Sequence, residues 1–276
     1  MNRYSALIPV YKNDSLLYLS IAVESMLNQT RPFDEILLVV EGKVNNEIEK
    51  YLTSLNNPVQ VLRIENQKGP LNFGLPATLN FGIKNATGDY IVRLDSDDYS
   101  VPERLEKVDA FLNKHASVNL LSSWVDEYDE DLDVLISTRR VPLLDREIRK
   151  KGKWKNPFNG PAAVFKRETA LGLGGYPIVA SNEDFCFWAE FIINGNTVGN
   201  IAEPLVKMRT GRSMIPRRKS KRYRMGTIQS NAYLYSIGYF GLQHLVWHSV
   251  INSILRRLPT RIFYIIQFKL FRFVKS

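Results

Sequence analysis

The sequence predicts an α/β protein with a mainly parallel β-sheet sandwiched by helices. Strand-like and helix-like segments alternate through the first hundred residues, and most of the strand-like runs are continuously apolar, as in strands buried on both faces. The composition is that of a globular protein, with 45% hydrophobic and 24% charged residues in a chain of 276. These proportions exclude a disordered or fibrous chain, and the single Cys186 excludes an intrachain disulfide.

The predicted elements follow a β-α-β-α-β-α-β order. Short apolar runs indicate strands at residues 4–10, 35–40, 59–64 and 89–94. Helical signals indicate helices at residues 16–27, 45–55 and 77–85, and the first of these segments has the apolar spacing of a helix. This order predicts parallel strands joined by right-handed crossovers. Because ligands bind beyond the carboxyl ends of such strands, the residues that directly follow a strand are the first candidates for a site.

An acidic block follows the fourth predicted strand. Asp95, Asp97 and Asp98 place three carboxylates within four residues. Mg²⁺ and Mn²⁺ prefer such oxygen ligands and complete their coordination with substrate phosphates. A solvated Asp-rich turn before a helix is the structural alternative. No Walker or GxGxxG motif occurs, so phosphate binding at this place would depend on a metal ion.

Four segments, in order, resemble glycosyltransferase family 2 of the GT-A fold, which is Rossmann-like. They are SALIPVYKND, EILLVVEG, GLPATLNFGIKNATGDYIVRLDSDD and GGYPIVASNEDFCFW, and the resemblance spans roughly residues 1–210. The chain looks especially like bacterial enzymes that assemble exopolysaccharide, capsule or O-antigen chains. The resemblance implies an inverting, metal-dependent hexosyltransferase. Such an enzyme moves a sugar from a nucleotide-sugar donor, usually a uridine diphosphate (UDP) sugar, to an acceptor hydroxyl.

The resemblance assigns donor binding to residues that mostly follow the predicted strands. They are Pro9, Val10, Tyr11, Glu41, Lys68, Asn80, Asp95, Asp97 and Arg209. Asp95, Asp97 and Asp98 match the acids that hold Mn²⁺ or Mg²⁺, and Arg212 is the alternative to Arg209 for reaching the diphosphate. Glu41 departs from the family pattern, which more often has Asp at this position, so the identity of the nucleotide base is open.

A second acidic pair is the candidate for catalysis. Glu183 and Asp184 begin a predicted helix over residues 185–193, where the family has its ED motif. Carboxylates in a first helical turn also stabilise the helix dipole, so a capping pair is the structural alternative. The resemblance implies that Asp184 is the general base that takes the acceptor proton. It implies an orienting or acceptor-binding role for Glu183.

Residues 156–165 match the strand that lines the acceptor side in the family. Where many members have His in this segment, the chain has Asn159 followed by Gly160. Trp154 and Trp188 are candidates for stacking on a sugar, with burial in the core as the alternative.

Charge divides the chain into two parts. Residues 207–276 carry 15 Lys and Arg and no acid, whereas residues 1–206 hold 22 basic and 28 acidic residues, a net charge of −6. We therefore predict a glycosyltransferase domain over 1–206 and a basic, aromatic-rich helical tail over 207–276. Basic side chains share one face of a predicted helix over 261–275, which is typical of an interfacial anchor on anionic lipid. Residues 225–255 lack charge but are too polar to predict a transmembrane span.

From the basic tail we predict a cytoplasmic enzyme that is peripheral at the inner face of the cytoplasmic membrane, where lipid-linked saccharide acceptors lie. The apolar stretch at residues 6–10 is too short for a signal peptide. His244 and His248 have metal-ligand spacing, but no acid follows Glu203, so we interpret them as two side chains on one helix face.

Two other functions are alternatives. A nucleic-acid-binding protein would use the basic tail, but the acidic body and the LDSDD segment would then have no role, so we expect no nucleic-acid partner. A sugar nucleotidyltransferase would have a glycine-rich, Lys- or Arg-bearing loop after the first strand, which residues 11–14 do not supply.

Overall fold

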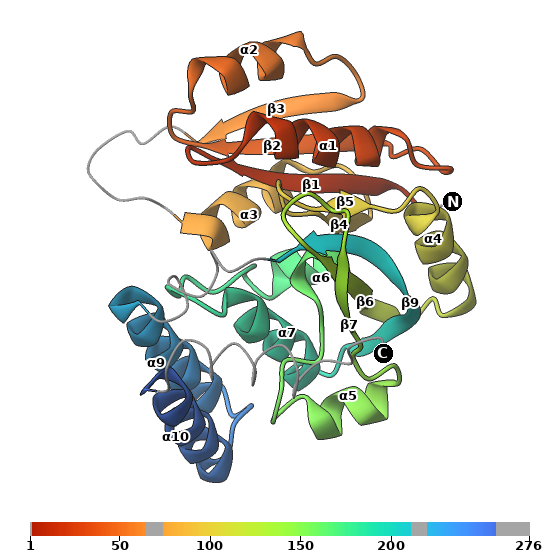
Figure 1. Ribbon diagram of the computed structural model, residues 1–276. Helices are drawn as coiled ribbons and strands as arrows, with labels where there is room; N and C mark the ends of the chain where they lie inside the picture. The colour runs from red at the N-terminus through yellow and green to blue at the C-terminus, as the bar shows by residue number, and fades with distance from the viewer. Residues whose placement is uncertain (1, 65–73, 211–219, 258–276) are drawn as a thin grey trace.

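The computed structural model describes residues 2–64, 74–210 and 220–257 and contains one large mixed sheet flanked by helices (Figure 1). The strand order is β3-β2-β1-β4-β8-β6-β9-β5, and β7 pairs with β6. The strands are β1 (Tyr4–Tyr11), β2 (Glu35–Glu41), β3 (Val59–Ile64), β4 (Tyr90–Arg93), β5 (Tyr99–Ser100), β6 (Val118–Tyr128), β7 (Leu135–Arg139), β8 (Val164–Lys166) and β9 (Thr197–Arg209). The helices are α1 (Leu16–Leu27), α2 (Asn46–Ser54), α3 (Gly74–Asn85), α4 (Arg104–Lys114), α5 (Asp145–Lys151), α6 (Arg167–Gly172), α7 (Glu183–Ile193), α9 (Lys221–Ser236), α10 (Leu242–Arg257) and the 3₁₀ helix η1 (Gly160–Ala162).

The first half of the sheet confirms the predicted β-α-β order. β1 lies between β2 and β4 and is parallel to both, and β3 continues the parallel set beyond β2. The four predicted strands and three predicted helices are all present, with ends that shift by three residues at most. The second half is mixed, because β8 runs antiparallel to β4 and β6, while β9 runs parallel to β6. Of residues 156–165, only the last two belong to a strand.

Hydrophobic residues fill both faces of the sheet, because successive side chains of a strand point to opposite sides. In β1, Ala6 and Ile8 belong to one core cluster and Leu7 belongs to the other. Helices α1, α2 and α4 contribute to the first cluster, and α3, α6 and α7 contribute to the second. The sheet therefore lies between two helical layers, and the carboxyl ends of β1, β2 and β4 are left free to form a site.

The C-terminal helices pack against the second helical layer. Leu234 of α9 is buried in the second core cluster, and the hydroxyl of Tyr233 donates to Glu190 of α7. Strand β9 continues to Arg209 and so crosses the boundary that we predicted at residue 206 from the charge distribution. The division into a domain over 1–206 and a tail over 207–276 stays a prediction. The predicted helix over 261–275 lies outside the described residues. Within the described ranges, no helix is both long and apolar enough to cross a membrane.

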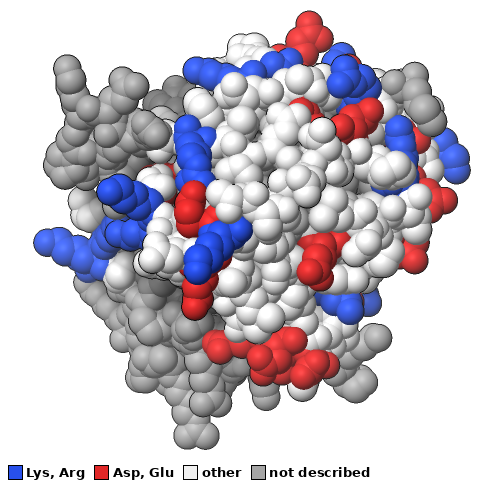
Figure 2. All heavy atoms as spheres, turned by 90° about the horizontal axis from the view of Figure 1, so that it is seen from above, with Lys and Arg blue, Asp and Glu red and all other residues white. Residues whose placement is uncertain are grey.

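The face seen from above carries no large patch of only basic or only acidic side chains (Figure 2). Lys and Arg side chains alternate there with Asp and Glu around a broad uncharged area.

Candidate active site

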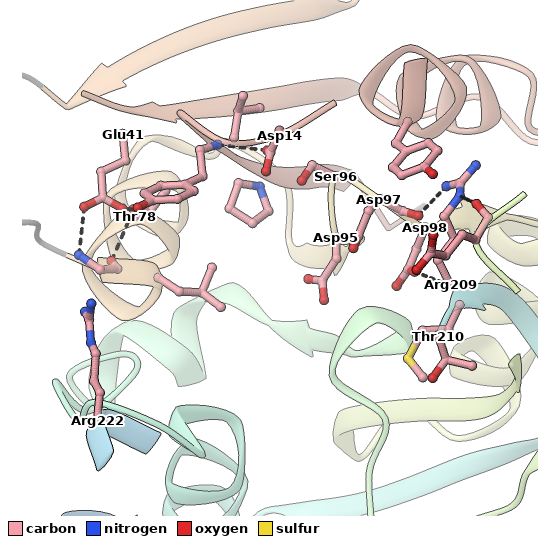
Figure 3. A pocket seen from close by; sticks show the side chains of 18 residues that line it. Asp14, Glu41, Thr78, Asp95, Ser96, Asp97, Asp98, Arg209, Thr210 and Arg222 are labelled. Atoms are coloured by element: carbon pink, nitrogen blue, oxygen red, sulfur yellow. Dashed lines mark hydrogen bonds between the residues drawn. The ribbon is translucent and has the colours of Figure 1, made fainter. Parts of the chain in front are cut away.

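A pocket of about 790 Å³ opens at the carboxyl ends of β1, β2 and β4 (Figure 3). Eight of the residues singled out in the sequence line it: Pro9, Val10, Tyr11, Glu41, Asp95, Asp97, Asp98 and Arg209. They come together because the parallel strands end at the same edge of the sheet. The pocket also has lining residues that the sequence did not single out, among them Asp14, Tyr18, Thr78 and Arg222.

The loop after β1 is fixed by Asp14. Its carboxylate accepts a hydrogen bond of 2.9 Å from the backbone N–H of Tyr11, which holds the Tyr11 ring at the pocket mouth. Burial raises the pKa of Asp14. It does not cap α1, whose N-cap is Ser15, and the Ser15 side chain makes no capping bond. Asp14 therefore shapes the pocket wall.

Glu41, at the end of β2, is tied to the first turn of α3. Its carboxylate accepts from the backbone N–H of Gly74 at 2.9 Å and from the hydroxyl of Thr78 at 3.3 Å (Figure 3). Gly74 adopts a φ of +73°, a conformation that favours glycine. Glu41 thus joins the strand end to the helix and lines the pocket at the same time.

The three aspartates after β4 form a compact acidic cluster. One carboxylate oxygen from each of Asp95, Asp97 and Asp98 lies within 4.8 Å of the others, and no other such group occurs in the described part of the chain. Although the Asp97 side chain is exposed, desolvation by its surroundings and the charge of the neighbouring Asp95 raise its pKa to about 6. Asp98 is fully buried and accepts a 2.9 Å hydrogen bond from the backbone of Arg209. This set of hard oxygen donors fits Mg²⁺ or Mn²⁺.

Arg209 lies beside the aspartates, at the end of β9. Its guanidinium stacks on the ring of Tyr18 at 4.1 Å and donates to the backbone carbonyls of Asp97 and Glu130. These contacts fix a positive charge at the acidic cluster and join β9 to the loop after β4. Figure 3 shows Arg209 and Asp98 on the same side of the pocket.

Arg93 links the acidic cluster to the second acidic pair. Its Nε and Nη2 donate to Oδ1 of Asp95 at 3.1 and 2.9 Å, and its Nη1 donates to Oδ1 of Asp184. The Arg93 side chain is only 2% exposed, whereas Asp95 and Asp184 are 32% and 22% exposed, so the guanidinium is shielded from water and the carboxylates are partly accessible. Arg93 was not among the predicted site residues, and its signal in the sequence is a lone arginine at the end of an otherwise apolar strand.

Glu183 and Asp184 lie in the first turn of α7, as predicted. Burial and the neighbouring Asp184 raise the pKa of Glu183 to about 7. Burial also raises the pKa of Asp184, while the Arg93 charge opposes that increase. Neither carboxylate lines the pocket, but Arg93 connects Asp184 directly to Asp95 at its edge.

Asn80 does not line this pocket, and its donor role stays a prediction. Its side-chain amide donates to the carbonyl of Tyr176 at 2.9 Å and accepts from the N–H of Tyr176 at 2.7 Å. This pair of bonds joins α3 to the loop before α7, so the geometry gives Asn80 a structural role. Lys68 and Arg212 lie outside the described residues.

The remaining residues considered in the sequence do not line the pocket. Trp188 is fully buried in the second core cluster, whereas Trp154 is exposed on the surface beside α10. Asn159 is buried and donates to the carbonyl of Ser123 at 2.7 Å. His244 packs on Trp154 and Phe240, so it is part of a helix–loop contact. Cys186 is buried, as expected of a core residue.

Comparison with known proteins identifies relatives over nearly the whole chain. The sequence profile described as Glycosyl transferase family 2 matches residues 5–171. The UDP-Gal:alpha-D-GlcNAc-diphosphoundecaprenol beta-1,3-galactosyltransferase of Escherichia coli is 31% identical, over 94% of this chain and 92% of the relative. The amylovoran biosynthesis glycosyltransferase AmsE of Erwinia amylovora is 28% identical, over 94% of this chain and 96% of its own length.

Solved structures share the fold. The structure of S. aureus TarS 1-349 in complex with UDP-GlcNAc superposes with a TM-score of 0.65 at 19% identity, covering 92% of this chain and 72% of that one. The mannosyltransferase PcManGT of Pyrobaculum calidifontis, solved with GDP-Man and Mn2+, gives 0.59 at 18% identity, covering 94% and 71%. The chain therefore has the GT-A fold, belongs to glycosyltransferase family 2 and is a glycosyltransferase.

Proposed function

We propose that this glycosyltransferase transfers a hexose from a UDP-sugar, with inversion, to a hydroxyl of a lipid-linked saccharide in cell-surface polysaccharide synthesis. The observation that carries the proposal is the acidic cluster of Asp95, Asp97 and Asp98 at the edge of a strand-end pocket. The relative that acts on a diphosphoundecaprenol-linked sugar supports the class of acceptor, and TarS with UDP-GlcNAc supports the class of donor.

In this proposal the donor occupies the pocket. Pro9, Val10 and Tyr11 line its nucleoside part, with the Tyr11 ring against the base. Glu41 borders the same part, and its contacts with α3 keep that wall in place. Arg209 supplies a fixed positive charge near the aspartates, which favours a diphosphate over a neutral ligand.

Asp95 and Asp97 would hold a Mn²⁺ or Mg²⁺ ion, with Asp98 as the third acid of the set. Such an ion, when bound, neutralises the charge that develops on the leaving nucleoside diphosphate. Asp98 has a second task in the chain, because its carboxylate holds the end of β9 through the Arg209 backbone.

The acceptor proton is taken by Asp184. Arg93 holds Oδ1 of this carboxylate, which opposes the rise in pKa that burial causes and fixes the direction of the group. Glu183, whose pKa is about 7, orients the acceptor through a carboxyl that is partly protonated at neutral pH. An inverting transfer needs a base on the side of the sugar opposite the leaving group.

The basic segment over 207–276 would bring the enzyme to the inner face of the cytoplasmic membrane. The 15 basic residues of this segment, with no acid among them, favour contact with anionic lipid.

Calorimetric titration of UDP, with and without Mn²⁺, tests the donor site. We expect Mn²⁺-dependent binding in the wild type, loss of binding in Asp97→Ala, and retention in the control Glu168→Ala, whose side chain is 89% exposed. Binding of another nucleotide in place of UDP would change the assigned nucleotide base of the donor. Failure of every nucleotide would overturn the assignment of the acidic cluster.

A further inference from the structure

Helix α10 presents an exposed apolar face. Five large apolar side chains lie on it, each between 48% and 65% exposed: Leu242, Val246, Trp247, Val250 and Ile254. At 3.6 residues per turn they fall within about 140° of the helix circumference. The other side of α10 packs inward through His244, which stacks on Phe240. The helix therefore has a buried side and, on the outside, a largely apolar strip that Gln243 interrupts.

Trp154 extends this strip from a second element, the loop after α5. Its ring lies edge-on to Trp247, with 5.8 Å between centroids, and 4.5 Å from the ring of His244. The loop is fixed to α10, because the Nε2 of His248 lies 2.9 Å from the carbonyl of Lys153. Two tryptophans from different parts of the chain are thus held together on the surface, although each is nearly half exposed. Exposed apolar surface of this extent marks an interaction site.

The surroundings of the strip are basic. Four lysines lie in the segment that carries Trp154: Lys150, Lys151, Lys153 and Lys155. Glu147 is an acid of the same helix, and it pairs with Lys151 at 3.7 Å. No acidic residue follows Glu203 in the sequence, so neither α9 nor α10 carries a negative side chain. An apolar strip with tryptophans and a basic border matches the headgroup layer of an anionic bilayer, where indole rings and cationic side chains are both stabilised.

We propose that the strip formed by the α10 face and Trp154 inserts into the surface of an anionic membrane. The proposal rests on the membrane location in the proposed function and deepens it by naming the surface that makes the contact. It also moves the principal contact from residues 261–275 to the α9–α10 hairpin. Because α9 packs on α7 and its Arg222 lines the pocket, the membrane would hold the catalytic domain through a fixed connection. Figure 1 shows the two helices side by side at the edge of the molecule, away from β3 and α2.

Quenching by brominated lipid tests the contact directly in the full-length protein. The chain has four tryptophans; Trp188 is fully buried and Trp124 of β6 is half-buried, so the double variant gives the background signal of these two. With vesicles of phosphatidylcholine and phosphatidylglycerol that carry brominated chains, we expect a blue shift and strong quenching in the wild type. The double variant Trp154→Phe/Trp247→Phe should lose both signals. Quenching that persists in the double variant would overturn the proposal.

Vesicle co-sedimentation tests the energetic contribution of the strip. We expect Val246→Asp/Val250→Asp to lower vesicle affinity about tenfold or more, because two exposed valines that would enter the bilayer are replaced by charges. The control Leu17→Asp/Ile178→Asp changes apolar residues that are even more exposed and lie on other segments, and it should bind as the wild type does. An unchanged melting temperature and unchanged UDP binding in both variants would exclude unfolding as the cause.

Three results would overturn the proposal. Normal vesicle binding by Val246→Asp/Val250→Asp would assign the contact to another segment. A concentration-dependent dimer that this variant abolishes would make the strip an interface between two copies. Protection of both tryptophans from acrylamide without vesicles would mean that the chain itself covers them. If the wild type binds vesicles but shows no UDP binding or no sugar transfer, the proposed function is overturned and the membrane contact is not.

Discussion

Gly160 lies directly against the carboxylate of Asp184. A Cβ added at residue 160 would overlap Oδ2 of Asp184, and it would come within 3.5 Å of Nη1 of Arg93. The carboxylate is therefore enclosed between the Gly160 backbone on one side and the Arg93 guanidinium on the other. The glycine at this position is explained by the space that Asp184 needs.

Replacement of Gly160 by alanine should displace Asp184 without removing any functional group. We expect kcat to fall about tenfold or more, because a shift of about 1 Å misaligns a base, while UDP affinity stays near the wild-type value. Steady-state kinetics and calorimetry check this. Gly172→Ala is the matched control, because a Cβ there meets nothing within 4 Å. Equal kcat values for the two variants would contradict the role of Asp184.

Arg93 should be needed for stability as well as for catalysis. Arg93→Met leaves the charges of Asp95 and Asp184 without their common partner, and we expect a loss of about 3–5 kcal/mol in the free energy of unfolding. The double variant Arg93→Met/Asp184→Asn should recover part of this loss, since it removes one unpaired charge. Urea unfolding of the four proteins of this cycle measures the coupling. Arg63→Met, which breaks a surface pair with Glu49, should cost less than about 1 kcal/mol.

Glu183 should make the protein less stable as the pH rises. Its pKa is raised from 4.5 to about 7 in the folded state, so the folded protein binds this proton more tightly than the unfolded chain does. The contribution is complete below about pH 4.5 and is lost as the pH passes through 7. Urea unfolding at pH 5 and pH 8, without metal, should show a smaller decrease in Glu183→Gln than in the wild type. The control Glu168→Gln should follow the wild type, and parallel curves for all three proteins would refute the shift.

Glu41 should contribute to both stability and nucleotide binding. The aspartate found more often at this position in the family is one methylene shorter, so Glu41→Asp should fail to keep both contacts with Gly74 and Thr78. We expect a loss of about 1 kcal/mol in the free energy of unfolding, as for a lost helix cap, together with weaker UDP binding. Thermal melting and calorimetry check the two effects. Thr78→Val, which removes the longer of the two contacts, should have the smaller effect.

Local patterns explain why much of the fold and part of the site were predictable. The apolar runs at residues 4–10 and 35–40 form buried strands, and the acids that follow residue 94 are neighbours in the sequence as well as in space. Their clustering needs no knowledge of the tertiary structure. The parallel order of the first strands then brings Pro9 and Glu41 to the same edge.

The connections between distant segments could not be predicted. Arg93 and Asp184 are 91 residues apart, and an arginine in an apolar strand gives no indication of its partner. Asn80 matched the family by position, but its amide is bound to the backbone of Tyr176, which lies 96 residues away. Such pairings depend on how α3 and α7 pack against the sheet, and the sequence pattern does not specify that packing.

The turn that leads into α7 is built on α9. Asn182, directly before Glu183, has a left-handed backbone with a φ of 57°, and its side-chain oxygen accepts from the hydroxyl of Tyr223 at 3.3 Å. Gly226 packs so closely on Ser181 that a Cβ there would overlap its backbone. The C-terminal hairpin thus supports the turn that carries the proposed catalytic pair. We expect a chimera joined after β9 to bring a foreign support for Glu183 and Asp184, so that an exchange of this hairpin alters the position of the pair as well as the proposed membrane contact.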